Sequence, residues 1–145
     1  MPRQDIYHEA VKHALIKDGW AITHDPFTLT FGRRRGFIDL GAERMLAAER
    51  EGRKIAVEVK SFVGVSALAD LEQALGQYLL YKSWLARLEP DRALFLALSD
   101  AVADDIFGDI SAQVLLEDYG IALIRVNMER EEVVGWTNSN TIEIS

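Results

Sequence analysis

Residues 55–60, Ile55-Ala56-Val57-Glu58-Val59-Lys60, decide how this sequence is interpreted. Apolar and polar side chains alternate along them, which predicts a strand with its branched residues on one face and Glu58 and Lys60 on the other. Because residues two apart on a strand lie roughly 6.5–7 Å apart on the same side, the strand holds a carboxylate beside an ammonium group. The same alternation is also typical of a half-exposed strand whose Glu–Lys pair is solvated.

The flanking sequence predicts a mixed α/β domain whose sheet lies between helices. Helical periodicity, with end signals such as Gly19 and Pro90, indicates helices over residues 4–18, 66–88, 100–107 and 111–118. Short apolar or alternating runs predict strands over residues 20–24, 27–31, 37–40, 45–49, 54–62, 92–98, 121–126 and 132–136, with turns at 32–36 and 51–52.

Length and composition bound the function. The chain has 145 residues, which fits one domain, and it contains no cysteine. We expect a cytoplasmic protein without a membrane span, because no apolar stretch is long enough to cross a bilayer and no signal peptide is recognisable. The net charge of −7 argues against non-specific coating of nucleic acid, which depends on Lys and Arg neutralising phosphates.

Asp39 adds a second acid at a useful spacing. It interrupts the apolar run 37–40, where an unpaired charge is costly, so it should be exposed, paired or metal-bound. Glu58 follows Asp39 by 19 positions, which allows one hairpin, so the two carboxylates can converge on one cation. Such a site would suit Mg²⁺ or Mn²⁺. An exposed aspartate at a turn before Gly41 is the alternative.

The long helix predicted over residues 66–88 has two different faces. Its core stripe is expected to comprise Leu68, Leu71, Leu75, Tyr78, Leu79 and Leu85. The opposite face aligns amides and aromatic rings with one acid, at Asp70, Gln73, Gln77, Tyr81 and Trp84. We expect Gln73, Gln77 and Tyr81 to line the same cleft as Glu58 and Lys60. The alternative is that this face packs against another part of the chain or a partner subunit.

The histidines offer no zinc signal. His8 and His13 are five residues apart, which does not match the i, i+4 spacing of zinc-binding helices, and His24 lies elsewhere. We expect all three to be surface or partly buried residues.

Two resemblances follow from these motifs. Asp39 followed by Glu58-Val59-Lys60 resembles the core of the PD-(D/E)XK nuclease superfamily, and residues 77–81 resemble the QxxxY element of some of its branches. Nearly the whole chain is similar to XisH proteins, the fdxN-element excision controlling factors. That likeness is carried by residues 5–8, 14–20, 38–43, 55–62 and 74–78, and fades after about Val126, so residues 137–145 are expected to be a variable tail.

The resemblance implies a restriction-endonuclease-like fold in a single domain, with a metal-dependent hydrolytic site. Asp39 and Glu58 would bind Mg²⁺ or Mn²⁺, helped by the Val59 carbonyl. Glu9 from the first helix is the candidate to complete the site, with a solvated surface role as the alternative. Lys60 would activate the attacking water and offset charge on the phosphate. We expect contacts to DNA from Gln73, Gln77 and Tyr81, and from Arg33, Arg34 and Arg35 acting as a phosphate clamp; the alternative for the arginines is an ordinary solvated turn. In this chain Ile38 stands where the superfamily motif has proline.

Three functions remain open at the level of sequence. The first is a DNA-acting protein that cuts or binds at Asp39, Glu58 and Lys60. The second is a non-catalytic accessory that uses the fold to bind an XisI-like partner and to support a site-specific recombinase. The third is a nuclease toxin restrained by that partner. A homo-oligomer is compatible with each.

Overall fold

The computed structural model describes residues 7–35, 45–62 and 66–137. In chain order its elements are α1 (His8–Lys17), β1 (Ala21–His24), β2 (Thr30–Phe31), β3 (Arg34–Arg35), β4 (Met45–Arg50), β5 (Arg53–Val59), α2 (Ala67–Leu88), β6 (Arg92–Ser99), α3 (Asp100–Phe107), α4 (Ile110–Asp118), β7 (Leu123–Asn127) and β8 (Glu132–Thr137). Within these ranges no helix is both long and apolar enough to cross a bilayer.

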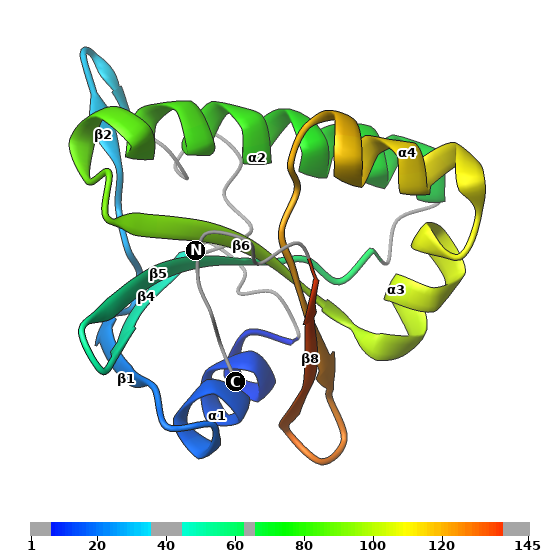
Figure 1. The fold of residues 1–145 in the computed structure, drawn as a ribbon, viewed down its shortest axis with the longest axis horizontal. Coiled ribbons are helices and arrows are strands. Elements are labelled where there is room, and N and C mark those ends of the chain that lie inside the picture. The colour runs from blue at the N-terminus through cyan, green and yellow to red at the C-terminus, as the bar shows by residue number, and fades with distance from the viewer. Residues whose placement is uncertain (1–6, 36–44, 63–65, 138–145) are drawn as a thin grey trace.

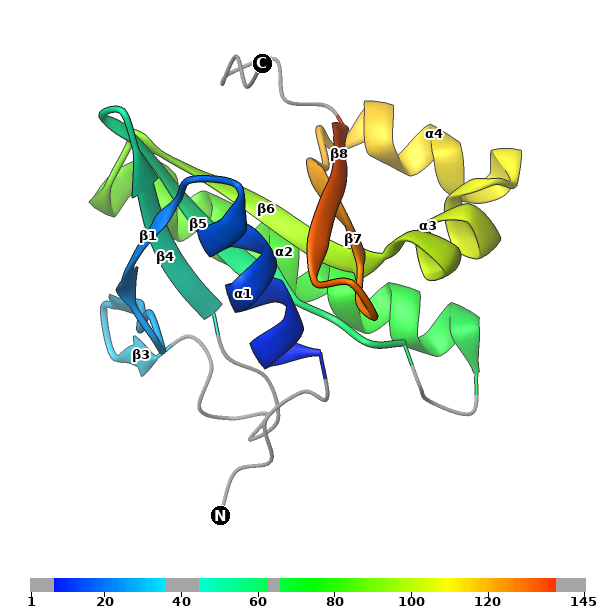
Figure 2. The same ribbon diagram turned by 90° about the horizontal axis from the view of Figure 1, so that it is seen from below.

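A mixed six-stranded sheet forms the centre, in the order β1-β4-β5-β6-β7-β8. The β5/β6 and β6/β7 pairs are parallel, and the other neighbours are antiparallel. Helices α2 and α4 lie on one face of the sheet and α1 on the other (Figure 1), and the view from below shows α1 crossing that second face (Figure 2). The predicted mixed sheet between helices is therefore confirmed.

The β4–β5 hairpin forms where the sequence predicts it. Arg50 pairs with Arg53, so Glu51 and Gly52 make a two-residue connection. Their φ angles are 51° and 80°, which is the left-handed backbone that such hairpins need and that glycine adopts without strain. This hairpin fixes the register of β5, so that Glu58 lies opposite Met45.

Helix α2 has the predicted length, but it buries a different stripe. Ser66 caps it, the Oγ atom accepting from the Ala69 N–H at 3.2 Å. Leu68 is 67% exposed and Leu79 37% exposed, so the prediction that both belong to the core is wrong. The buried stripe runs through the face that includes Tyr81, and comprises Leu71, Ala74, Tyr78, Tyr81 and Leu85.

Tyr78 shows why the helix is turned this way. Its hydroxyl donates to the Leu94 carbonyl at 2.9 Å and accepts from the Ala122 N–H at 3.0 Å. These two bonds tie α2 to β6 and to the start of β7. They also satisfy a hydroxyl that would be costly to bury alone.

Residues 27–35 differ from expectation. Residues 27–31 are not one strand, because only Thr30–Phe31 pair, and they pair with Arg34–Arg35 across a tighter turn than predicted. Phe27 instead donates its backbone N–H to the Met45 carbonyl at 2.7 Å. The strand expected at 37–40 lies outside the described residues.

Candidate functional site

Glu58 and Lys60 lie at the end of β5, on the face of the sheet that α2 covers. Ile55, Val57 and Val59 belong to the core on the α1 side, so the two faces separate as the alternation predicted. Glu58 is only 2% exposed and Lys60 5% exposed, and the Glu58 Oε2 and Lys60 Nζ atoms are 3.7 Å apart. The alternative of a solvated pair is therefore wrong.

Gln77 of helix α2 contacts the ammonium group of Lys60. Lys60 Nζ donates to Gln77 Oε1, and the Lys60 backbone N–H donates to the Ala97 carbonyl at 3.1 Å. Both ends of the lysine are thus fixed, one by the sheet and one by the helix. This contact places Gln77 beside Lys60, where the helix face led us to expect it; a role in binding substrate stays a prediction.

The other two residues of that face lie in different surroundings. Tyr81 is 3% exposed and packs in the core, with its ring centroid 6.1 Å from that of Trp84. Gln73 is exposed on the surface. The aromatic part of this face therefore packs against the chain itself, which was the alternative interpretation.

Glu58 affects the pKa of Tyr78 on helix α2. Burial raises the pKa of the Tyr78 hydroxyl to about 12; the bond from the Ala122 N–H opposes the shift, and the negative charge of Glu58 adds to it. Glu58 itself is 2% exposed, so its carboxyl group lies in a poorly solvated place. A carboxylate there has strong interactions with any cation within reach.

Asp39 lies outside the described residues. Met45, six residues later in the sequence, is the register partner of Glu58. Six residues span at most about 20 Å, so the connection allows Asp39 to approach Glu58. Its part in the site stays a prediction.

The arginine run is located on the β2–β3 hairpin. Arg33 is exposed in the turn, and Arg34–Arg35 form β3. Phe31 on β2 stacks on Trp84 of α2, with ring centroids 6.1 Å apart and an interplanar angle of 21°. This contact brings the basic turn beside the helix that carries Gln77.

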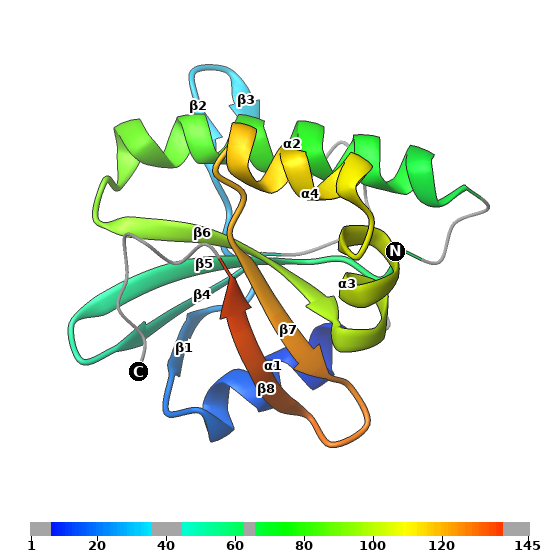
Figure 3. The same ribbon diagram turned by 45° about the vertical axis from the view of Figure 1, so that its right-hand side comes forward.

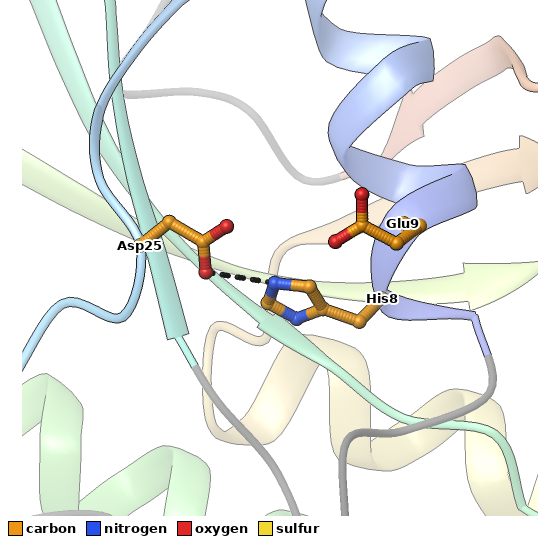
Figure 4. A group of neighbouring side chains, drawn as sticks. All are labelled: His8, Glu9 and Asp25. Carbon is orange, nitrogen blue, oxygen red and sulfur yellow. Dashed lines mark hydrogen bonds and ion pairs between the residues drawn. The ribbon is translucent and has the colours of Figure 1, made fainter.

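Glu9 belongs to a second group of ligand-type side chains. His8 Nε2 lies 2.8 Å from Asp25 Oδ1, and Lys12 Nζ donates to Asp25 Oδ2 at 2.9 Å. Figure 4 shows the His8 ring turned toward Asp25, with the Glu9 carboxylate close to both; candidate ligand atoms of these three lie within 4.8 Å of one another. The Glu9 side chain is 54% exposed, and its Oε1 atom also lies 3.8 Å from His13 Nε2. Its assignment to the Glu58 site stays a prediction.

Sequence reasoning missed the burial of His8. The residue is 0% exposed, contrary to the expectation of a surface or partly buried histidine. Asp25 follows β1 and is 17 residues away, so no local spacing could signal the contact. The pair fastens the start of α1 to the end of β1.

Asp25→Ala is expected to lower the free energy of unfolding by about 2–3 kcal/mol at pH 7, because buried His8 and partly exposed Lys12 each lose a charged acceptor. Burial alone would raise the pKa of Asp25, but the bond from Lys12 and the nearness of His8 hold that pKa below its ordinary 3.8. The stabilisation is therefore complete above pH 3.8 and is lost as the pH falls through the lower folded-state pKa. Urea denaturation at pH 7 and near pH 3 measures both effects.

Glu72→Ala is the matched control for that prediction, since Glu72 is an exposed acid of α2. It should change stability by less than about 0.5 kcal/mol at either pH. A gap between wild type and Asp25→Ala that stays constant down to pH 3 would contradict the ion-pair account.

Together, the mixed six-stranded sheet between helices and the buried acid–lysine pair at a strand end define an α/β protein with a candidate ionic site. The model of the family described as XisH protein matches residues 1–134, and the chain belongs to this family. No curated protein matches it.

Two crystal structures are similar over nearly the whole fold. An XisH family protein from Nostoc punctiforme PCC 73102 is 38% identical, with a TM-score of 0.83. An fdxN element excision controlling factor protein from Anabaena variabilis is also 38% identical, with a TM-score of 0.82. Each match covers 91% of this chain and 98% of the other.

Proposed function

We propose that this XisH-family chain acts on DNA through a metal-dependent phosphodiester-hydrolysis site of the PD-(D/E)XK type, built from Asp39, Glu58 and Lys60 on a restriction-endonuclease-like fold. The observation that carries the proposal is the buried Glu58–Lys60 pair clamped by Gln77. Burying two charges costs desolvation free energy that their mutual attraction often does not repay. A structural role would be met as well by apolar side chains of similar volume.

The described part of the proposed metal site fits a hard divalent cation. Glu58 would offer its carboxylate and Val59, the last residue of β5, its backbone carbonyl. Mg²⁺ and Mn²⁺ favour such oxygen ligands and keep several waters, so few protein ligands are needed. Asp39 would complete the set.

The residues of the chain would divide the remaining work. Lys60 is held in one position by Gln77 and Glu58, so its ammonium group can orient a water and offset charge on the phosphate without reorganising. A bound divalent cation would polarise the phosphoryl oxygen and make its water more acidic. The arginine turn would contact the DNA backbone outside the site.

Incubation of the protein with supercoiled, linear and branched DNA, with Mn²⁺, with Mg²⁺ or with EDTA, tests the proposal. We expect metal-dependent cleavage that falls at least about 100-fold in Glu58→Gln and is unchanged in Glu72→Gln, an exposed acid of α2. Equal cleavage by wild type and Glu58→Gln would point to a contaminant. No cleavage of any substrate would remove the hydrolytic function.

A second candidate function is the non-catalytic accessory. It is favoured by the net charge of −7 and by exposed apolar side chains at the two ends of α4, where Ile110 is 68% exposed and Tyr119, the residue after the helix, is 50% exposed. On this proposal the chain binds an XisI-like partner and supports a site-specific recombinase. Partner binding that survives Glu58→Gln and needs no divalent metal, with no cleavage in the assay above, would select it.

A further inference from the structure

Two segments that touch in the structure carry positive charge in an otherwise acidic chain. Residues 28–35 contain three arginines, and residues 73–88 contain Lys82 and Arg87; neither segment contains Asp or Glu. The whole chain has 23 acids against 16 bases. The Phe31–Trp84 stack joins the two segments, and Figure 3 shows the β2–β3 hairpin beside α2. The surface they form together suits a polyanion.

Aromatic rings are built into this basic surface. Phe31 is 37% exposed, and its ring stacks on half-buried Trp84, which in turn contacts buried Tyr81. Phe31 therefore packs on Trp84, and Trp84 packs against the core that contains Tyr81. Arg33 in the β2–β3 turn and Arg87, one helical turn beyond Trp84 on α2, are both exposed. We call Phe31, Arg33, Trp84 and Arg87 the aromatic–basic strip.

The strip is connected to the candidate site by one rigid element. Gln77, which binds Lys60, and Trp84 lie seven residues apart on α2. At 1.5 Å per residue this is about 10 Å along the helix axis. The strip and Lys60 are therefore held at a fixed separation by one helix.

We propose that the aromatic–basic strip binds an unpaired stretch of DNA, with Phe31 stacking on a base and Arg33 and Arg87 contacting phosphates. A contact of the same strand with Lys60 would rest on the proposed function. An unpaired strand fits better than a duplex, because bases in a duplex already stack on each other and leave no face for Phe31. Stacking on aromatic side chains, beside cationic groups that track the backbone, is how proteins hold single strands.

The test is fluorescence anisotropy in EDTA, which prevents hydrolysis, with a labelled 20-nucleotide single strand of mixed sequence, its duplex and the equivalent RNA. We expect the DNA single strand to bind most tightly. Phe31→Ala and Phe31→Leu should each weaken it about 10- to 100-fold, and Phe31→Trp should restore it. The leucine variant keeps apolar packing on Trp84, so a loss there reports on stacking. Arg33→Gln should reduce the salt slope by about 1.

Leu68→Ala is the matched control, since Leu68 is an exposed apolar residue at the other end of α2 and should leave binding unchanged. Thermal melts verify that every variant is folded. The proposal for the strip is overturned if wild type does not bind the single strand, or if wild type and Phe31→Leu bind it equally. A preference of wild type for duplex DNA or for RNA overturns it as well. Single-strand binding without any metal-dependent cleavage would remove the hydrolytic proposal and leave the strip. Cleavage without a Phe31 effect would do the reverse.

Discussion

Glu58→Gln is expected to weaken Mn²⁺ binding at least about 100-fold, because a neutral amide replaces a carboxylate ligand of a hard cation. The fold should survive the change. The amide keeps the shape of the side chain, and Lys60 retains its acceptor on Gln77. The lysine stem is also long enough to move its charge toward solvent. We therefore expect a change of less than about 1 kcal/mol in metal-free stability.

Calorimetric Mn²⁺ titration, beside metal-free melts of both proteins, measures the two effects. Glu9→Gln is the informative companion variant, because Glu9 lies beside His8 and Asp25 in this structure. If Glu9 contributes to the Glu58 site, both variants lose the same binding event. If Mn²⁺ binds Glu58→Gln as well as it binds wild type, the metal is held elsewhere, and the hydrolytic proposal loses its centre.

The strand that carries the candidate site could be predicted because its signals are local. Alternation along residues 55–60 and the Glu51-Gly52 turn fix the face and the register of β5 without reference to the rest of the chain. The N-cap at Ser66 and the stop before Pro90 fix the ends of α2 in the same way.

The orientation of α2 could not be predicted, because apolar residues surround much of that helix. Leu68, Leu71, Leu79 and Leu85 allow more than one core stripe, and the spacing alone does not choose between them. The choice depends on contacts distant in sequence, such as the hydroxyl of Tyr78 reaching Leu94 and Ala122.

Burial of the ionic pair also escaped sequence reasoning. A solvated and a buried Glu–Lys pair give the same alternating pattern, and the difference arises from α2 covering this face and from Gln77 reaching Lys60. The contact between His8 and Asp25 is missed for a similar reason, since a chain reversal brings the two residues together.

Lys60→Met is expected to lower the free energy of unfolding by about 3–5 kcal/mol at pH 7, which is the usual cost of removing one partner of a buried pair. Without the ammonium at 3.7 Å, Glu58 at 2% exposure would either bury an uncompensated charge or take up a proton, and both are costly at pH 7. Glu58 cannot relieve this as Lys60 does in the converse variant, because its stem is shorter and starts within the sheet. The loss should therefore be much larger than that of Glu58→Gln.

The double variant Glu58→Gln/Lys60→Met tests the cause of that loss. It removes the isolated charge, so we expect it to recover most of the stability, and the cycle of four proteins should give a coupling energy of at least about 2 kcal/mol. Urea denaturation with an unchanged m value measures all four. If Lys60→Met costs less than about 1 kcal/mol, or the double variant is no more stable than Lys60→Met, Glu58 and Lys60 are not coupled. The buried pair would then no longer support a charged functional site at the end of β5.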